Sequence, residues 1–478
     1  TDSVLVFQRL VEFPREDQDF WKAEDQVRIV ANGFDDDGFI DKPISNYKVD
    51  RPDVQGSLTQ SIDVEGETGN VEITTATGTI LIVYTVFPED QPGSRLLARR
   101  SFDNGESWTP ATVLVDSEIE VTGASIAELG DGWVIAYRRA AGPRITDDQV
   151  CQGKQDDPFE CNPEGIPGAV MSLVCSNDAT MNCSPETEVM TLCPFDQQAS
   201  GATFRTFTFP WLAYDGNRVW AFATDRRFAG DDSCTAVPGA PGLFSGKPRV
   251  VAKSTVDGVN WVGTNADRKA PIVIAPRSTG FQVMPVATGA KGEVYVAWTD
   301  TTVEEEQGLP AGNNGILIND YSNASARVFR KADVWMTRLN GSSCSDRPNR
   351  GCSPAIEDPI RVSSYLTAMS QRQADEKQEI EADLKNLRTH SSGSLAFTGD
   401  YKAMAAMPLR QIADDSWIPN SVPEGTFGPE RPGFTDREDV FIAWGDNRDV
   451  DANFVIDPEG AEQLYYTPPL NSPANAGG

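Results

Sequence analysis

Histidine and basic residues are scarce in this chain of 478 residues. It contains one histidine, His390, and its 41 Lys and Arg are outnumbered by 71 Asp and Glu, for a formal net charge of -30. With one histidine, zinc sites of the Cys/His type and Ser-His-Asp triads are disfavoured. Because phosphate binding needs a basic surface, the charge argues against nucleic acid as a partner.

Long apolar runs and metal-type cysteine spacings are also missing. No run of about 18 apolar residues exists, so we expect no membrane span. The chain begins at Thr1 without a basic and apolar leader, which fits a mature product of export. Its eight cysteines form no CxxC pair, and an even number without metal spacing predicts disulfides. We therefore expect a secreted, extracellular or cell-surface protein.

What the sequence does contain is a repeat. A strand-like segment rich in β-branched and aromatic residues, bounded by Gly, Asp or Asn, recurs five times and is followed each time by a further strand-like segment. The five copies are GTILIVYTVF (78–87), DGWVIAYR (131–138), GNRVWAFATDR (216–226), GEVYVAWTD (292–300) and EDVFIAWGDNR (438–448). An antiparallel unit of this kind cannot bury both faces alone, and radial stacking solves the problem. The pattern predicts an all-β fold, a β-propeller.

A turn motif follows two of these units. Ser101–Trp108 reads SFDNGESW and matches S-x-D-x-G-x-x-W in full, and Ser254–Trp261 is a shifted, degenerate copy. In such a turn the Asp accepts backbone N–H bonds, the Gly takes a positive φ and the Trp packs back on the sheet. The chain here resembles the sialidase-like, Asp-box (BNR) β-propellers over most of residues 60–468.

A second likeness is more specific. Phe397–Tyr401 (FTGDY) and Phe441–Asp449 (FIAWGDNRD) look like the GDY…WxDNRD signature of secreted bacterial sialidase-like proteins. The resemblance implies six blades in a single domain over residues 1–468, with residues 1–60 closing the ring. Residues 469–478 are expected to be a flexible tail. It also implies that Asp boxes are fold markers on the face away from any catalytic pocket.

Two repeat units carry cysteines where the Asp box is expected. We infer that Cys175–Cys183 and Cys344–Cys352 staple those hairpins in place of the box. Cys151–Cys161 and Cys193–Cys234 follow by elimination.

One helix and two calcium loops are predicted outside the repeat. Residues 364–388 show helical apolar periodicity among Glu/Lys pairs. Alternating acidic residues are typical of calcium loops, although neither candidate has the complete motif. The alternative is an acidic turn, and no organic cofactor is expected. The candidate ligands are Asp35, Asp37 and Asp41 in one loop and Asp449, Asp451 and Asn453 in the other.

Two functions stay open. The first is a non-catalytic extracellular propeller for binding, surface display or assembly, with a protein or glycan partner or with itself. The alternative is a glycoside hydrolase of the exo-sialidase type. Sialidases hold their first catalytic Arg in a Phe-Arg-x-Pro motif, which this sequence lacks, so no catalytic residue is carried over. We expect no hydrolysis of sialosides or common aryl glycosides. The polar residues to examine are Asp400, Tyr401, Asp446 and Arg448.

Overall fold

The structure, a computed structural model, consists of strands and the connections between them, with no helix in the part that it describes. The described residues are 4–7, 10–14, 19–23, 28–32, 39–49, 57–64, 67–74, 78–88, 93–103, 105–143, 168–178, 180–193, 208–225, 248–275, 282–290, 292–300, 333–341, 344, 350–362, 389–390, 395–396, 402–411, 417–419, 437–444 and 464–465.

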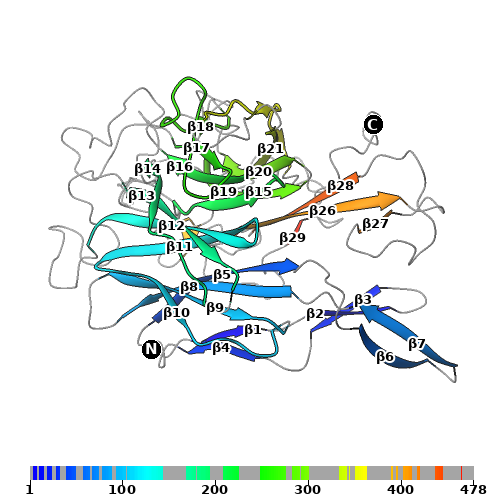
Figure 1. The fold of residues 1–478 in the computed structure, drawn as a ribbon. Coiled ribbons are helices and arrows are strands. Elements are labelled where there is room, and N and C mark those ends of the chain that lie inside the picture. Colours follow the sequence, from blue (N-terminus) through cyan, green and yellow to red (C-terminus); the bar gives the residue numbers. More distant parts are fainter. Residues whose placement is uncertain are drawn as a thin grey trace, which may run out of the picture.

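Five antiparallel sheets follow one another along the chain, and we call them blades 1 to 5 (Figure 1). Blade 1 contains β5 (Phe39–Val49), β8 (Gly78–Phe87), β9 (Ser94–Ser101) and β10 (Thr112–Ser117). Blade 2 contains β11 (Ile119–Leu129), β12 (Gly132–Pro143), β13 (Gly168–Ser176) and β14 (Thr187–Leu192). Blade 3 contains β15 (Trp211–Tyr214), β16 (Val219–Asp225), β17 (Arg249–Thr255) and β18 (Ile272–Val273).

Blades 4 and 5 follow the same plan with additions. Blade 4 contains β19 (Gln282–Ala290), β20 (Glu293–Asp300) and β21 (Asp333–Asn340), with β22 (Ala355–Ile356) and β23 (Ile360–Arg361) both paired to β21. Blade 5 contains β26 (Lys402–Gln411), β27 (Trp417–Pro419), β28 (Arg437–Trp444) and β29 (Leu464–Tyr465). The first strands β5, β11, β15, β19 and β26 contact one another in that order, so they form the inner side of the fan.

Apolar side chains from adjacent blades form the core. The second strands alternate their side chains between two neighbours, as a strand's period of two requires. Trp133 and Ile135 of β12 pack toward blade 1, whereas Val134 and Ala136 pack toward blade 3. Further clusters join blade 3 to blade 4 and blade 4 to blade 5. Blades 2, 3 and 4 therefore bury both faces against neighbouring blades, which is the solution that the repeat predicted.

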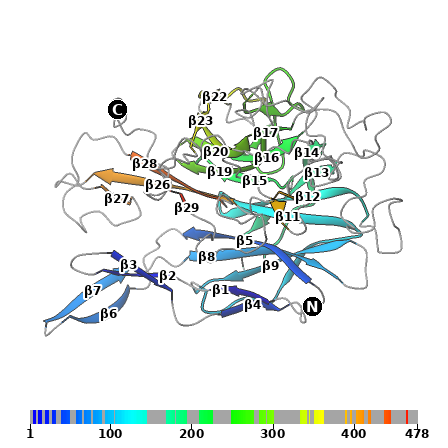
Figure 2. The same ribbon diagram turned by 180° about the vertical axis from the view of Figure 1, so that it is seen from behind.

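Four short strand pairs lie outside the blades, and Figure 2 shows most of them from behind. They are β1 (Val4–Phe7) with β4 (Arg28–Asn32), β2 (Leu10–Pro14) with β3 (Asp19–Ala23), β6 (Ser57–Val64) with β7 (Glu67–Thr74), and β24 (Thr389–His390) with β25 (Leu395–Ala396). Val30 and Ala31 of β4 pack against the face of blade 1 that points away from blade 2. The β1–β4 ribbon thus covers blade 1 where a preceding blade would lie.

The predicted β-propeller is confirmed. The five sequence repeats are the second strands β8, β12, β16, β20 and β28. Whether residues 1–60 complete a sixth blade and close the ring stays a prediction, and the predicted helix at 364–388 lies outside the described residues. In the part of the chain that the structure describes, no helix is long and apolar enough to cross a membrane.

Candidate functional site

The two ends of blades 2 to 4 differ in the length of their connections. At one end, which we call the turn end, the first and second strands are joined by tight turns such as Gly130–Asp131 and Asp215–Arg218. At the other, the loop end, the second and third strands are joined through residues 144–167, 226–248 and 301–332. Binding residues concentrate on loops held by a rigid scaffold, so the loop end is the candidate functional face.

The turn end of blade 1 carries the Asp103 turn, Ser101–Trp108. Asp103 Oδ1 accepts the backbone N–H of Ser107 at 2.8 Å, and Ser101 Oγ accepts that of Gly105 at 2.7 Å. Gly105 has a φ of +89°, a conformation that favours glycine. Burial would raise the pKa of Asp103, but the hydrogen bonds from Ser107 and Ser101 outweigh it and hold the pKa at about 2. The turn has the hydrogen bonds that its sequence predicts.

Blade 3 carries the Asp257 turn, which begins one residue later than the motif copy at Ser254–Trp261 suggested. Thr255, rather than Ser254, donates its hydroxyl to Asp257 and accepts the N–H of Gly258. Asp257 Oδ1 then accepts the N–H groups of the residues two and three positions ahead, at 3.0 and 2.7 Å.

Sequence reasoning missed a third turn of this kind, the Asp178 turn of blade 2. Asp178 Oδ1 accepts the N–H groups of Thr180 and Met181, which stand two and three positions ahead, at 2.9 and 3.0 Å. The disulfide between Cys175 and Cys183 closes the same hairpin. The expectation that a disulfide replaces the Asp turn in blade 2 was therefore wrong, because this hairpin contains both. The signal in the sequence was the Ser-x-Asp at residues 176–178.

The Asp257 and Asp178 turns also reach the preceding blade, and the Asp103 turn reaches the cluster beneath the β1–β4 ribbon. Trp261 of blade 3 donates to Ser172 Oγ of blade 2 at 2.9 Å, and Asn177 of blade 2 donates to Thr79 Oγ1 of blade 1 at 3.3 Å. Trp108 packs on the cluster that blade 1 shares with the β1–β4 ribbon. The turn end is thus occupied by contacts that hold the blades together.

The predicted hairpin disulfides are both present. Cys175 is bonded to Cys183, and Cys344 to Cys352. Cys193 is disulfide-bonded, and its predicted partner Cys234 lies outside the described residues, as does the predicted pair Cys151 and Cys161.

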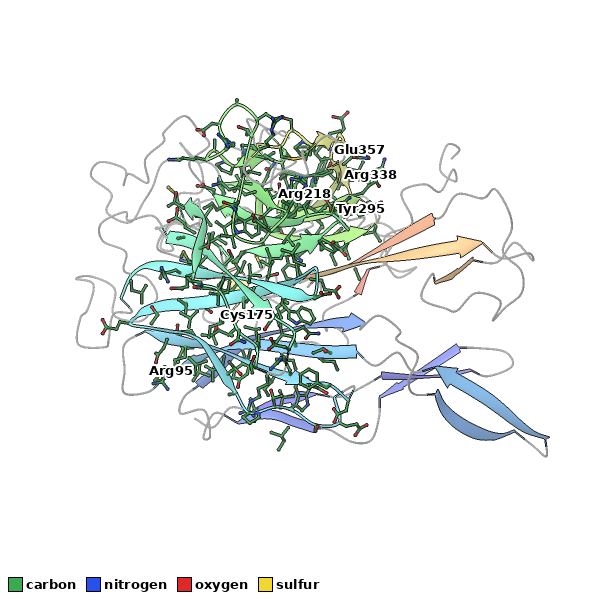
Figure 3. The ribbon with its side chains drawn as sticks, in the orientation of Figure 1. Arg95, Cys175, Arg218, Tyr295, Arg338 and Glu357 are labelled. Carbon is green, nitrogen blue, oxygen red and sulfur yellow. A yellow bond between two sulfur atoms is a disulfide. The ribbon has the colours of Figure 1, made fainter. Side chains whose placement is uncertain are left out.

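Two networks around an Arg and a carboxylate lie away from the inner strands. In blade 4, Arg338 donates to Glu293 at 3.0 Å and to Glu357, and these bonds, Glu357 first, raise its pKa (Figure 3). In blade 2, Tyr137 and Arg139 both donate to Glu186, whose pKa is raised by burial. Tyr137 is fully buried in the core between blades 1 and 2, so its hydroxyl serves the packing of that core.

At the loop end the inner strands are irregular. The pairing register shifts between Thr122 and Ser125 in β11 and between Val283 and Val286 in β19. Within the second shift Met284 has a φ of +54°, which is uncommon for a residue with a side chain. Bulges of this kind are over-represented next to functional sites, where they redirect side chains.

Hydrogen bonds between blades hold these bulges in place. Ser125 Oγ of blade 2 accepts the N–H of Leu212 in blade 3 at 2.8 Å, and Thr224 Oγ1 of blade 3 accepts that of Met284 in blade 4 at 3.2 Å. Phe209 lies over Gly123, where an added Cβ would be 2.1 Å from its ring. The loop end therefore rests on a rigid frame.

Buried ionisable residues stand at the loop ends of the second and third strands. Asp225 ends β16 and accepts the N–H of Cys193 in blade 2 at 3.2 Å. Asp300 ends β20 and accepts Trp298 Nε1 at 2.9 Å. Both are 0% exposed, and Arg249, the register partner of Asp225, is also buried. Sequence reasoning took the Thr-Asp endings of these strands for ordinary strand boundaries and did not single them out.

The residues singled out from the sequence lie mostly outside the described residues. They are Asp400, Tyr401, Asp446 and Arg448, and the predicted calcium ligands Asp35, Asp37, Asp449, Asp451 and Asn453. Asp41 belongs to β5, where its backbone pairs with Thr85. Lys402 directly follows Tyr401, Trp444 stands two residues before Asp446, and these two flanking residues are register partners at the loop end of blade 5. Among the described residues, no group of three or more His, Cys, Asp or Glu is placed to hold a metal ion.

Comparison with known proteins finds similarity in structure alone. No family model and no curated protein matches the sequence. The GH93 α-L-arabinofuranosidase of Fusarium graminearum, solved with arabinobiose, is 12% identical with a TM-score of 0.31; the match covers 62% of this chain and 65%, just under two thirds, of that one. The α-L-arabinanase of Cellvibrio cellulosa, solved with arabinohexaose, is 10% identical with a TM-score of 0.29, and the match covers 58% of this chain and 73% of that one. The α-L-arabinofuranosidase of Lactobacillus brevis is 6% identical with a TM-score of 0.32, and the match covers 81% of this chain and 86% of that one.

Proposed function

We propose that the protein is an extracellular propeller that binds a glycan at the loop end of blades 2 to 5. The observation that carries the proposal is the contrast between the two ends. The turn end is taken up by the Asp103, Asp178 and Asp257 turns and their contacts with preceding blades or with the β1–β4 ribbon. The loop end joins long connections to bulged inner strands that are locked by hydrogen bonds between blades.

The choice of a glycan rests on the resemblance to sialidase-like Asp-box propellers and on charge. A neutral glycan suits a chain with a net charge of -30, because no long-range repulsion opposes its approach. The two hairpin disulfides support an extracellular location, since such bonds persist in oxidising compartments. A protein partner or self-assembly is the other class of partner, and the binding experiment distinguishes it.

Hydrolysis of a glycosidic bond is the second candidate, and one observation favours it. Lys402 and Trp444 are register partners, so the chain leaves blade 5 toward the Gly-Asp-Tyr and Trp-x-Asp-Asn-Arg motifs from adjacent strands. Asp446 and Tyr401 are the residues that we assign to such a reaction. Most glycosidases use two carboxyl groups on either side of the scissile bond, and in sialidases a Tyr takes the place of the nucleophilic carboxylate.

The test is a glycan array probed with the intact protein, together with hydrolysis assays on fluorogenic sialosides, aryl arabinofuranosides and arabinan. We expect saturable glycan binding that is weakened by Asp446→Asn and retained in Asp103→Ala, the matched variant at the turn end. Turnover that is abolished by Asp446→Asn or Tyr401→Phe would establish the hydrolase instead. Binding that is lost in Asp103→Ala with unchanged melting temperature, or concentration-dependent self-association without glycan binding, would refute the proposal.

A further inference from the structure

The inner strands carry one tryptophan. Trp211 begins β15 at the loop end of blade 3, and the other inner strands that the structure describes contain no tryptophan. Its side chain is half-buried, whereas Trp133, Trp220 and Trp298 of the second strands are 0% exposed. Trp211 is thus placed differently from the tryptophans of the core.

Two contacts show where the indole of Trp211 lies. Its Nε1 donates to the carbonyl of Ala287 in blade 4 at 2.6 Å. The indole also packs against both the core between blades 3 and 4 and the core between blades 4 and 5. In the part of the chain that the structure describes, β19 is the end strand of the blade 4 sheet, with no strand paired to its inner edge. A side chain of blade 3 reaches the far side of blade 4 across this edge, so the indole lies along the inner side of β19.

A second aromatic residue stands just before Trp211. Phe209 is half-buried and lies over Gly123 in the inner strand of blade 2. Residues two positions apart in a regular strand project to the same side. Phe209 lies before the start of β15, and the two rings contact opposite neighbours, blade 2 and blade 4. The start of β15 thus places aromatic side chains against the inner strands of both neighbouring blades.

Hydrogen bonds hold this segment in place. Leu212, the residue after Trp211, donates its N–H to Ser125 Oγ of blade 2 at 2.8 Å, and the indole is fixed to Ala287 of blade 4. A side chain that is already ordered loses little conformational entropy when a ligand binds. Sites for small ligands combine such aromatic surfaces with a few fixed polar groups. The position therefore suits a ligand with an apolar face.

We propose that Trp211 is the platform on which one sugar ring of a neutral glycan stacks, at the inner side of blade 4. The C–H face of a sugar ring is apolar and packs on an aromatic face, while the hydroxyls at its rim form hydrogen bonds. A neutral glycan fits because the net charge of -30 would repel an anionic sugar. The inference rests on the proposed function, and it adds the residue that the glycan contacts and the class of sugar.

Variants of Trp211 test the platform in the intact protein. Wild type, Trp211→Ala and Trp211→Phe are applied to a glycan array that carries neutral and sialylated oligosaccharides. We expect the wild type to bind neutral glycans, and Trp211→Ala to weaken that binding by about tenfold or more, as truncation of a central aromatic contact does. Trp211→Phe should recover most of the affinity, because a ring remains although the bond to Ala287 is lost.

Trp335 supplies the matched control. It is half-buried and packs against the same core between blades 3 and 4, but it stands on the third strand β21. Trp335→Ala should lower the melting temperature and leave the affinity unchanged. Acrylamide quenching of tryptophan fluorescence gives a direct readout, because the array glycan that binds most strongly should shield Trp211 in the wild type and produce no such shielding in Trp211→Phe. This comparison decides the question even if Trp211→Ala does not fold.

The outcomes separate this inference from the proposed function. A wild-type protein that binds no glycan on the array would refute both. Binding of neutral glycans that Trp211→Ala leaves unchanged, or that Trp335→Ala weakens equally, would overturn the platform and leave the proposed function standing. Shielding from acrylamide that persists in Trp211→Phe would likewise place the sugar against another tryptophan.

Discussion

A methyl group added at Gly258, in the Asp257 turn, tests most directly whether this turn packs against blade 2. Its φ is +75°, and an added Cβ would lie 2.4 Å from Val174 Cγ2 and 3.1 Å from Val134 Cγ2 of the preceding blade. Gly258→Ala therefore combines two penalties. The left-handed conformation costs about 1–2 kcal/mol for a residue with a side chain. Overpacking of a dense core costs about 1–3 kcal/mol.

The sum predicts that Gly258→Ala destabilises the protein by about 2–5 kcal/mol. Gly292 supplies the control, because its φ is +85° and an added Cβ would meet nothing within 4 Å. Gly292→Ala should cost only the backbone contribution, about 1–2 kcal/mol. The difference between the two variants isolates the contact between blades 2 and 3.

Urea denaturation followed by tryptophan fluorescence measures both variants against the wild type. We expect the midpoint for Gly258→Ala to lie clearly below that for Gly292→Ala, with similar slopes. Equal midpoints would show that the Asp257 turn does not press on blade 2, and the account of the turns as contacts between blades would then fail.

Three further predictions concern the turns and the metal. Asp103→Ala should cost about 0.5–1.5 kcal/mol, less than for a buried turn, since the bonds from Ser107 are exposed. Because the pKa of Asp103 is depressed to about 2, the stability that Asp103 contributes is present above the ordinary carboxyl pKa of 3.8 and is lost as the pH falls through 2. Melting temperatures of the wild type and of Asp103→Ala, measured over this pH range, check the prediction. A difference in melting temperature that does not change with pH would contradict it. Replacing both Cys175 and Cys183 by Ser should cost about 2–3 kcal/mol from loop entropy while circular dichroism stays native, because the Asp178 turn remains; an unfolded variant would refute that role. If the loop with Asp37 and Asp41 binds calcium, a chelator should lower the melting temperature, and Asp37→Asn with Asp41→Asn should reduce that response; an unchanged response would exclude that loop.

The strand pattern could be predicted because it depends on local chemistry. The repeat segment at 78–87 coincides with β8, and the following segment at 94–101 coincides with β9, since β-branched and aromatic runs bounded by turn residues leave little choice of structure. The hairpin disulfides were predictable for a similar reason, because each pair brackets a short turn. The Asp178 turn escaped attention because it lacks the Gly and Trp of the full motif.

The candidate site was harder to predict because it depends on contacts between blades. Nothing in the sequence around Met284 indicates a left-handed residue, which is held by Thr224 some 60 positions earlier in the chain. The environment of Asp225 likewise depends on Cys193 of another blade.

The Asp178 and Asp257 turns contact the blade before them and the Asp103 turn contacts the β1–β4 ribbon, so these contacts all point toward the N-terminal side of the propeller. Under a pulling force applied at the N-terminus, the β1–β4 ribbon would come away first and uncover Trp108, after which each blade in turn would lose the neighbour that its own turn overlaps. A force applied at the C-terminus would instead pull on each blade together with its own turn, and so would act directly on the contact between that turn and the blade before it. The two ends of the chain should therefore yield at different loads, and attachment to a surface through one end or the other would set how much tension the protein withstands.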